Sequence, residues 1–364
     1  MDAKGIGFLA VLIVWGGLFY LYSLTPAVPS VFAGNGSFTA AVFSTVNSAF
    51  SGNDSGSVSS QPFGYIDENG EFKNSQMHFD DPVGISQIEV SPTDSSLFFA
   101  VSNSGLFASK DSGLNWYSFS DVEHKLNSGV AVYKILFNPE NKKESFVSVF
   151  SNGVGTVYKS ENNFLSLEKL IDFNSEGVYD FDIKGNDLYL GLSNGKIIIY
   201  SLDKNESRIL TALSSPITGL RIPPGGNLIY LALKSGGLYL SYDGGQSFSR
   251  LKYLDNYKGA NTINDFFVSP SNNSLIYAAT DYGLIRSYDA GVTWKVFKSL
   301  PSEVASVSMV TLNKKGEIFT ASNGKIYKSR DEGKNWQIIE TNFGIQISTL
   351  VFDQNKIIIG AGNK

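Results

Sequence analysis

A serine and an aspartate two residues apart, followed by a glycine and an aromatic residue, are the side chains whose types and spacing most suggest chemistry in this sequence. Several such aspartates could ligate a divalent cation or act as catalytic carboxylates. The same residues also suit a tight turn, because serine and aspartate bond to nearby backbone N–H groups and glycine adopts a positive φ. The four complete copies are Ser109, Asp111, Gly113, Trp116; Ser241, Asp243, Gly245, Phe248; Ser287, Asp289, Gly291, Trp294; and Ser329, Asp331, Gly333, Trp336.

These copies recur about 40 to 50 residues apart when degenerate copies at Ser160 and Ser201 are included. Residues 85–116 and 263–294 align without a gap and share Val-Ser-Pro, Ser-Leu, Gly-Leu and the complete motif. Each repeat holds four short strands separated by polar turns, the pattern of a β-propeller blade. The aspartates should therefore lie on separate blades, where they have a structural role and cannot converge on a metal or a substrate.

Six such blades are expected, and fragments at the two ends of the repeat region predict a seventh. The six cover approximately residues 83–120, 127–171, 177–211, 215–253, 260–298 and 303–340. Residues 347–364 match the first half of a blade, and residues 63–74 supply a strand, a turn and another strand. We therefore predict an all-β fold, a single seven-bladed β-propeller over residues 61–364, closed by N-terminal strands that complete the C-terminal blade.

The first 60 residues have a different composition. Residues 6–24 form an uncharged apolar run that, as a helix, is long enough to cross a bilayer, and Lys4 favours a short cytoplasmic N-terminus at residues 1–5. A cleaved signal peptide ending at Ala33 is the alternative. Residues 25–60, rich in Ser, Gly and Ala, suit a linker. We expect a single-pass cell-membrane protein with an extracytoplasmic propeller, or a secreted or periplasmic one after cleavage.

Composition argues against several classes of partner and cofactor. The formal net charge is −5, and the first arginine is Arg208, so a nucleic-acid-binding surface is not expected. The chain has no cysteine, which excludes disulfides, thiol nucleophiles and thiolate metal sites. Two histidines, His78 and His124, are too few for a zinc site made by histidine alone. We expect neither a cofactor nor a bound metal.

The copy at Ser287, Asp289, Gly291, Thr293 and Trp294 resembles the Asp-box, also called the BNR repeat. This resemblance implies a propeller but no single function, since the repeat occurs in sialidases, xyloglucan-cleaving glycosidases, sortilin-type receptors and photosystem II stability and assembly factors. One exported propeller behind one hydrophobic segment is most similar to the last group and its non-photosynthetic bacterial relatives. In that group the propeller is an assembly module that binds other proteins.

Two departures from that group limit the resemblance. Its members typically carry an arginine patch, and its lipid-anchored members carry a cysteine, whereas this chain has no cysteine and no arginine in its first three complete blades apart from Arg208 near the end of the third. A photosynthetic role is therefore not expected. A protein-binding propeller tethered to a membrane remains the prediction.

A sialidase would need three arginines converging at the centre of the ring. Only Arg221, within Arg-Ile-Pro, is expected on an inner strand; the arginines expected on outer strands or in turns are Arg208, Arg250, Arg286 and Arg330. Other glycosidases need only a pair of carboxylates over a sugar-binding cleft. A carbohydrate-active protein, either a lectin-like binder or a glycoside hydrolase, is therefore the alternative function.

The face opposite the Ser-Asp-Gly turns is expected to bind a partner. Tyrosine offers rigid, amphipathic contact area, so the loop 253–261 is the best candidate contact. The predicted binding residues are Glu123, His124, Lys125, Tyr253, Tyr257, Lys258 and Tyr282. Other polar residues expected on this face are His78, Asp80, Asp81, Asp255, Asp281 and Glu303. The predicted function is that of a non-enzymatic, membrane-anchored scaffold or assembly factor that binds a protein.

Overall fold

The structure, a computed structural model, describes residues 14–15, 18–19, 61–79, 83–127, 129–301, 304, 306–353 and 356–362. The chain divides into two compact units, Met1–Gly56 and Ser57–Lys364. In the first unit, β1 (Val14–Trp15) pairs antiparallel with β2 (Leu18–Phe19). The rest of the predicted membrane helix and the predicted linker lie outside the described residues. Within the described part, no helix has the length and apolarity needed to span a bilayer.

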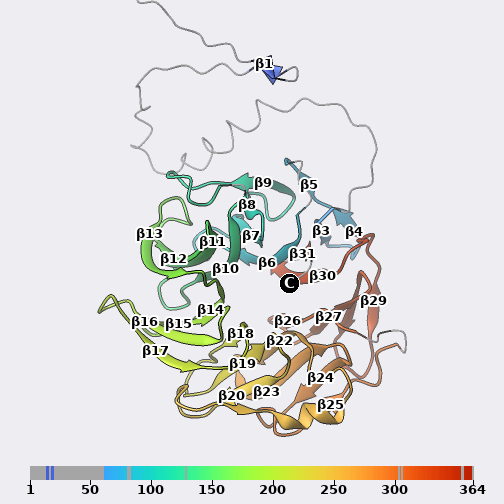
Figure 1. Cartoon of the computed structure of the whole chain (residues 1–364). Coiled ribbons are helices and arrows are strands. Elements are labelled where there is room, and N and C mark those ends of the chain that lie inside the picture. Colours follow the sequence, from blue (N-terminus) through green and yellow to red (C-terminus); the bar gives the residue numbers. More distant parts are fainter. Residues whose placement is uncertain are drawn as a thin grey trace, which may run out of the picture. The chain divides into compact units, whose positions relative to one another are not determined.

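The second unit is a seven-bladed propeller (Figure 1). The four main strands of each blade pair antiparallel, and the first strand of each blade faces the centre of the ring. Blade 1 contains β6 (Ile85–Val90), β7 (Phe98–Ser102), β8 (Gly105–Ser109) and β9 (Asn115–Phe119); blade 2, β10 (Ala131–Phe137), β11 (Ser145–Ser151), β12 (Val154–Ser160) and β13 (Glu168–Asn174); blade 3, β14 (Val178–Lys184), β15 (Asp187–Leu192), β16 (Lys196–Ser201) and β17 (Glu206–Ala212). Blade 4 contains β18 (Ile217–Arg221), β19 (Ile229–Leu233), β20 (Leu238–Ser241) and β21 (Ser249–Arg250); blade 5, β22 (Ile263–Ser269), β23 (Asn272–Thr280), β24 (Gly283–Ser287) and β25 (Lys295–Val296); blade 6, β26 (Met309–Leu312), β27 (Ile318–Ser322), β28 (Lys325–Ser329) and β29 (Gln337–Ile339).

Blade 7 joins the two ends of the propeller. Its inner strands are β30 (Ile347–Asp353) and β31 (Lys356–Ala361), and its outer strands are β3 (Phe63–Ile66) and β4 (Phe72–Asn74). Strands β3 and β31 pair antiparallel. This pairing confirms the predicted closure, in which N-terminal strands complete the C-terminal blade and leave no open sheet edge between the ends.

The core lies between the blades, because the middle strands of each sheet are covered on both faces. Every residue of β7, β8, β19 and β27 is buried. Fourth strands are more exposed, as in β17, where the first four residues are all exposed. Apolar runs in the middle strands and polar residues in the outer strands follow from this gradient of burial.

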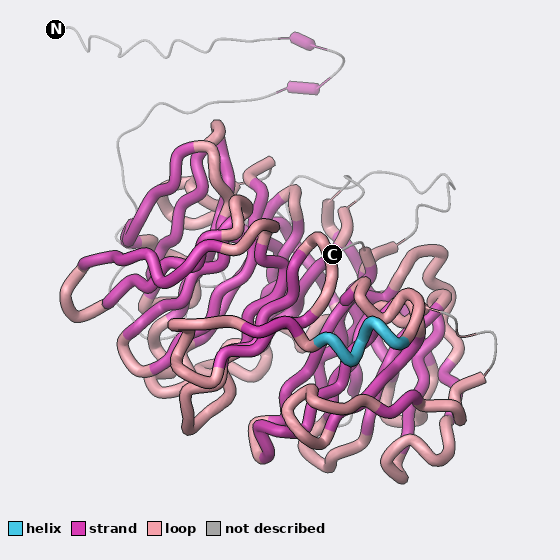
Figure 2. Tube along the Cα trace, turned by 60° about the horizontal axis from the view of Figure 1, so that its bottom comes forward, coloured by secondary structure: helices cyan, strands magenta, loops and turns pink. Residues whose placement is uncertain are grey.

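Two elements were not predicted from the sequence. Strand β5 (Gln76–Met77) adds to blade 1 by pairing in parallel with β9, which makes that sheet five-stranded. The loop between blades 4 and 5 contains a 3₁₀ helix, η1 (Lys252–Asn256), which Figure 2 shows as the helical segment of the ring. Leu254 is fully buried and attaches η1 to the core between blades 4 and 5.

The Ser-Asp-Gly turns share one hydrogen-bond pattern. In the turn from β24 to β25, Ser287 Oγ accepts from Gly291 N (2.8 Å) and donates to Asp289 Oδ1 (2.8 Å), which also accepts from Thr293 N (2.8 Å). Equivalent bonds occur in the turns that begin at Ser109, Ser241 and Ser329. The aspartates thus serve as turn residues on separate blades.

The aromatic residue that ends each turn is not equally buried. Trp116 and Trp294 are at most 2% exposed, and each indole donates to the carbonyl of the turn glycine at 3.0 Å. Phe248 and Trp336 are only half-buried, and the Trp336 indole donates instead to Ser299 Oγ. The aromatic residue is therefore fully packed into the core in blades 1 and 5 and only partly in blades 4 and 6.

Candidate functional site

A cavity of about 1500 Å³ occupies the centre of the ring and is lined mainly by the first strands of the blades. These strands share an irregularity, since blades 1 to 5 and 7 each skip one first-strand residue in the pairing with the second strand. Such a bulge leaves its residue outside the ladder and turns its side chain toward a new direction. The skipped residues, Ser86, Tyr133, Tyr179, Thr218, Asn264 and Ser348, all line the cavity.

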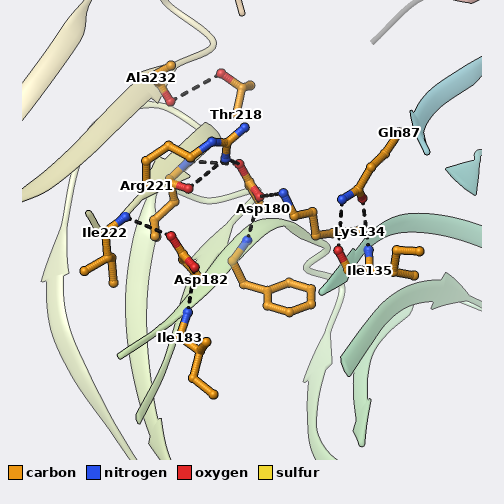
Figure 3. A network of polar contacts seen from close by, with 12 residues as sticks. Gln87, Lys134, Ile135, Asp180, Asp182, Ile183, Thr218, Arg221, Ile222 and Ala232 are labelled. Carbon is orange, nitrogen blue, oxygen red and sulfur yellow. Dashed lines mark hydrogen bonds and ion pairs between the residues drawn. The ribbon is translucent and has the colours of Figure 1, made fainter. Parts of the chain in front are cut away.

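A buried ion-pair group joins blades 2, 3 and 4 at the cavity wall (Figure 3). The Asp180 carboxylate lies 3.0 Å from Lys134 Nζ and 2.7 Å from Arg221 Nη1. The same carboxylate accepts a hydrogen bond from Leu220 N at 2.9 Å. Asp180 therefore has a cationic partner on each neighbouring blade and a backbone donor on blade 4, and its negative charge is compensated.

Other inward side chains also bond to the next blade. Gln87 in blade 1 accepts from Ile135 N and donates to Ile135 O in blade 2. Asp182 accepts from Ile222 N at 2.8 Å, and Asp265 accepts from Val310 N at 3.1 Å. Two serine bonds continue this series across blades 6, 7 and 1: Ser308 Oγ donates to Ile347 O, and Ser348 Oγ donates to Ile85 O. These contacts hold neighbouring blades together.

The protonation equilibria of the cavity carboxylates differ. Burial raises the pKa of Glu89, and its hydrogen bond with Gln87 offsets only part of this effect. Burial also raises the pKa of Asp182, although the backbone N–H groups of Ile222 and Ile183 oppose the rise. For Asp180 burial acts in the same direction, but the charges of Lys134 and Arg221 outweigh it and lower the pKa. The ion-paired carboxylate thus keeps its charge while the other two lose theirs more readily.

The positions of the arginines match those expected. Arg221 lies at the end of β18 and lines the cavity, where it binds Asp180. Arg208, Arg250 and Arg286 lie in β17, β21 and β24, all outer strands, and Arg330 follows β28 in a turn. One arginine, already engaged by a carboxylate, cannot make the three-arginine site of a sialidase.

The predicted tyrosines come together beside blade 5. The rings of Tyr253 and Tyr257 have centroids 6.1 Å apart, and those of Tyr257 and Tyr282 are 5.1 Å apart. Tyr253 and Tyr282 are more than a third exposed, whereas Tyr257 packs on the core and its hydroxyl donates to Trp294 O at 3.5 Å. We call Tyr253, Tyr257 and Tyr282 the tyrosine cluster. It extends from the β23–β24 turn along the side of the blade.

The loop that carries two of these tyrosines is held in place by polar contacts. Arg250 donates two hydrogen bonds of 2.7 Å to Asp255, and Asn261 donates to the same carboxylate at 2.6 Å. Gly259, at φ +95°, lies so close to the backbone of Asp281 that an added Cβ would meet it at 3.2 Å. The cluster is therefore displayed on a fixed loop, and Lys258 lies in that loop next to Tyr257.

Glu123, His124 and Lys125 lie at a different blade junction, between blades 1 and 2. Lys125 Nζ contacts Glu123 at 2.7 Å and donates to Leu167 O at 3.0 Å, and His124 Nδ1 lies 3.0 Å from Ser120 Oγ. Leu167 follows the Ser160 turn, so this loop packs along the outer side of blade 2. The structure therefore does not group these three residues with the tyrosine cluster (Figure 1).

The remaining polar residues expected on this face have separate surroundings. His78 stacks on Tyr117 with centroids 4.4 Å apart, and its Nε2 lies 3.1 Å from Asn115 Oδ1. This histidine is thus packed against the outer strand of blade 1. Asp80, Asp81 and Glu303 lie outside the described residues. In the part that the structure describes, no three acidic or histidine side chains form a group suited to a metal ion.

Comparison with known proteins supports the fold. YCF48 from Cyanidioschyzon merolae superimposes with a TM-score of 0.60 and 14% identity, over 77% of this chain and 94% of that one. It has the same propeller fold. The extracellular domain of BT4673 from B. thetaiotaomicron gives a TM-score of 0.61 and 17% identity, over 80% of this chain but only 39% of that one. YCF48 bound to D1 peptide also matches, with a TM-score of 0.60 and 14% identity, over 85% of this chain and 96% of that one.

Sequence comparison gives a partial match of another kind. A stretch of 123 residues is 27% identical to a xyloglucanase of Hypocrea jecorina (strain QM6a). This stretch is 32% of this chain and 14% of the xyloglucanase, so the chain covers only a small part of that enzyme. No family model matches the sequence.

The sequence predictions missed the polar wall of the cavity except for Arg221. The signal was present, since charged residues interrupt otherwise apolar first strands, as Lys134 does in β10 and Asp180 does in β14. Single charged residues in strands are usually solvent-exposed, and only the ring places these side chains against the neighbouring blade. The residues concerned are Gln87, Glu89, Lys134, Asp180, Asp182 and Asp265.

Proposed function

We propose that this chain is a membrane-anchored, extracytoplasmic propeller that acts as a non-enzymatic scaffold or assembly factor by binding another protein. The observation that carries the proposal is the tyrosine cluster on its fixed loop. Two of its rings are more than a third exposed beside a partly buried third, and tyrosine is enriched where proteins bind one another. A loop already held by Arg250 and Asp255 loses little conformational entropy on binding.

The comparison with YCF48 supports this proposal. That propeller has been solved bound to D1 peptide, and its fold covers most of this chain. At 14% identity the likeness shows only that the two chains share a fold. The contact residues of this chain, and the chemistry of its partner, therefore have to be inferred from its own surface. The tyrosine cluster and the lysine beside it are the group we assign to that contact.

The test is capture of partners from detergent-solubilised membranes with the full-length tagged chain. Tyr253→Ala with Tyr282→Ala should remove the bound protein, because both changes delete exposed contact area. The matched control is Tyr242→Ala with Tyr288→Ala, since these tyrosines are also exposed but belong to Ser-Asp-Gly turns. Capture that is equal in the two double variants, or absent in the unchanged protein, contradicts the proposal.

Membrane anchoring is a separate part of the proposal and rests on the apolar run at residues 6–24. An uncleaved segment keeps the propeller at the membrane surface, where it can reach membrane-associated partners. N-terminal sequencing and intact mass of the native protein test this. A mature chain that starts at Gly34 would replace the anchor with a cleaved signal peptide.

A carbohydrate-active function is the second candidate, on the partial match to a xyloglucanase. The central cavity also holds two aromatic rings, since Tyr133 and Tyr179 lie 5.0 Å apart there beside Asp180. The ion pairs of Asp180 with Lys134 and Arg221 argue against a hydrolase, because a carboxylate in two ion pairs is a poor general acid or base. Binding and turnover on a glycan panel, repeated with Tyr179→Ala, separate this function from protein binding.

A further inference from the structure

A small, open pocket lies next to the tyrosine cluster; apolar side chains line it, although polar atoms make up much of its accessible surface, and we call it the apolar pocket after those side chains. It has a volume of about 300 Å³ and is lined by Tyr282, Leu284, Val296, Phe297, Leu300 and Pro301. Tyr282 belongs to both the cluster and the pocket, so the ring contacts that run from Tyr253 through Tyr257 end at a residue of the pocket wall. A concave site of this size, walled by apolar side chains, has room for a large aliphatic or aromatic side chain.

The charges next to these apolar surfaces are mainly positive. Lys252 and Lys258 flank the tyrosines in sequence, and Lys298 lies between Phe297 and Leu300 of the pocket. All three are exposed, and within the described part of the chain none of them forms an ion pair. These ammonium groups favour an anionic occupant.

The nearby carboxylates are already engaged by other groups. Asp255 is bound by Arg250 and Asn261. Asp281 accepts hydrogen bonds of 3.0 Å from Asn264 and from Ser306. Neither carboxylate forms a direct ion pair with these lysines in the described contacts, although Asp255 interacts electrostatically with Lys252. Arg250 and the three lysines outnumber these two carboxylates, so the described charges around the cluster sum to a net positive charge.

We propose that the tyrosine cluster and the apolar pocket bind an acidic peptide segment of a partner protein, with one large apolar side chain in the pocket. This inference rests on the proposed protein-binding function and specifies the chemistry of the partner. Glutamate or aspartate side chains pair with Lys252, Lys258 and Lys298, while the tyrosines cover the apolar face of the segment. A pocket continuous with aromatic rings favours a peptide over an anionic lipid surface, which presents head groups and no single anchoring side chain.

The experiment measures binding of labelled twelve-residue peptides to the full-length protein in detergent by fluorescence anisotropy. The probe carries four glutamates and one central phenylalanine. Two control peptides replace the glutamates with glutamine or the phenylalanine with serine. We expect each control to bind at least about tenfold more weakly, and we expect binding of the probe to weaken as salt is raised.

Two variants locate the site. Reversing the three lysines to glutamate (Lys252→Glu, Lys258→Glu, Lys298→Glu) should weaken probe binding at least about tenfold. The matched control reverses three exposed lysines on other blades, Lys142, Lys143 and Lys204, with the same change in net charge and no expected effect. Leu300→Asp should also weaken binding, and equal melting temperatures show that the variants are folded.

Three outcomes overturn the inference. These are equal binding of the acidic and glutamine peptides, equal effects of the two lysine triples, and binding to phosphatidylglycerol vesicles without binding to any peptide. If partner capture still depends on Tyr253 and Tyr282 while the acidic peptides fail, only this inference is lost. If capture also fails, the proposed function is lost with it.

Discussion

At the scale of single residues, the Ser-Asp-Gly turns depend on backbone geometry more than on the identity of any one side chain. The degenerate turn at Ser160 keeps the bond pattern, with Phe164 N donating to Ser160 Oγ at 3.0 Å and Ser166 N donating to Asn162 Oδ1 at 2.9 Å. Phe164 stands where other turns have glycine and adopts φ +65°. Its fully buried ring packs on Phe99 and Phe137, which offsets the cost of that conformation.

Two adjacent glycines in the Ser241 turn, Gly244 and Gly245, allow the steric cost of an added side chain to be separated from the cost of a positive φ. Both Gly244 and Gly245 have positive φ, but a Cβ on Gly244 meets nothing within 4 Å, whereas one on Gly245 lies 2.4 Å from Leu210 Cδ2. We expect Gly244→Ala to cost about 1 kcal/mol in unfolding free energy. Gly245→Ala should cost about 2 kcal/mol more because Leu210 must move. Chemical denaturation of the two variants measures the difference, and equal costs would exclude the steric explanation.

The turn aspartates predict a loss of stability in acid. Hydrogen bonds from Ser247 lower the pKa of Asp243 to about 2, and hydrogen bonds from Asn335 lower the pKa of Asp331 to about 2. In the unfolded chain the pKa of an aspartate is about 3.9. A carboxyl with a depressed folded-state pKa stabilises the fold above the unfolded value, and this contribution disappears as the pH falls toward the folded value. Stability should therefore decrease between about pH 4 and pH 2.

Thermal unfolding at several pH values tests this expectation. The double variant Asp243→Asn with Asp331→Asn should be less stable near neutral pH and should lose less stability between pH 4 and pH 2 than the unchanged protein. Asp203→Asn is the control variant. Asp203 lies in the degenerate turn at Ser201, which is closed by Asn205 at φ +53° and lacks the turn glycine, so this substitution should leave the pH profile unchanged. A pH profile unchanged in the double variant would refute the assignment.

At the scale of elements, several first strands have two functions, since each pairs with its own sheet and those of blades 1, 2, 3, 5 and 7 also bond to the next blade. The bulges in these strands direct side chains such as Thr218 and Ser348 toward backbone carbonyls: Thr218 donates to Ala232 O in its own blade, and Ser348 also donates to Ile85 O in the next one. These bonds, within a blade for Thr218 and between blades for Ser348, give the two side chains partners at the centre of the ring.

Asp180 is the element-scale contact whose removal should cost most. Asp180→Ala leaves Lys134 and Arg221 without their shared carboxylate, and breaking a buried ion pair on one side costs about 3 kcal/mol. Glu340→Ala, which removes an exposed pair with Lys325, should cost about 0.5 kcal/mol. Urea unfolding compares the two. A cost for Asp180→Ala as small as that for Glu340→Ala would show that the inter-blade pair contributes little.

At the scale of the whole molecule, stability depends on closing the ring through β3, β31 and β30. Deleting residues 347–364 removes both inner strands of blade 7, leaves β3 and β4 unpaired with them and exposes sheet edges. We expect this truncation to unfold or aggregate. Circular dichroism and size-exclusion chromatography check it, and a soluble truncation with a single cooperative melt would contradict the role of closure.

The sequence by itself determined the repeat period, the number of blades, the closure and the roles of the turn residues. Each of these depends on a local pattern of apolar strands, serine, aspartate and glycine that recurs along the chain, so it can be recognised without knowing which blades touch. The loop 253–261 was predicted as a contact for a different reason, its length and its tyrosines on the face opposite the turns, and its binding role stays a prediction.

Only the tertiary structure decided which distant side chains meet. Asp180 and Arg221 lie 41 positions apart, and their ion pair exists because the ring packs one inner strand against the next. The same packing brings Tyr282 to Tyr257, separates both from Glu123 and Lys125, and forms the pocket between Tyr282 and Leu300. Such contacts depend on the angle and register between blades, which no local pattern encodes, so a repeat predicts the propeller while its packing defines the site.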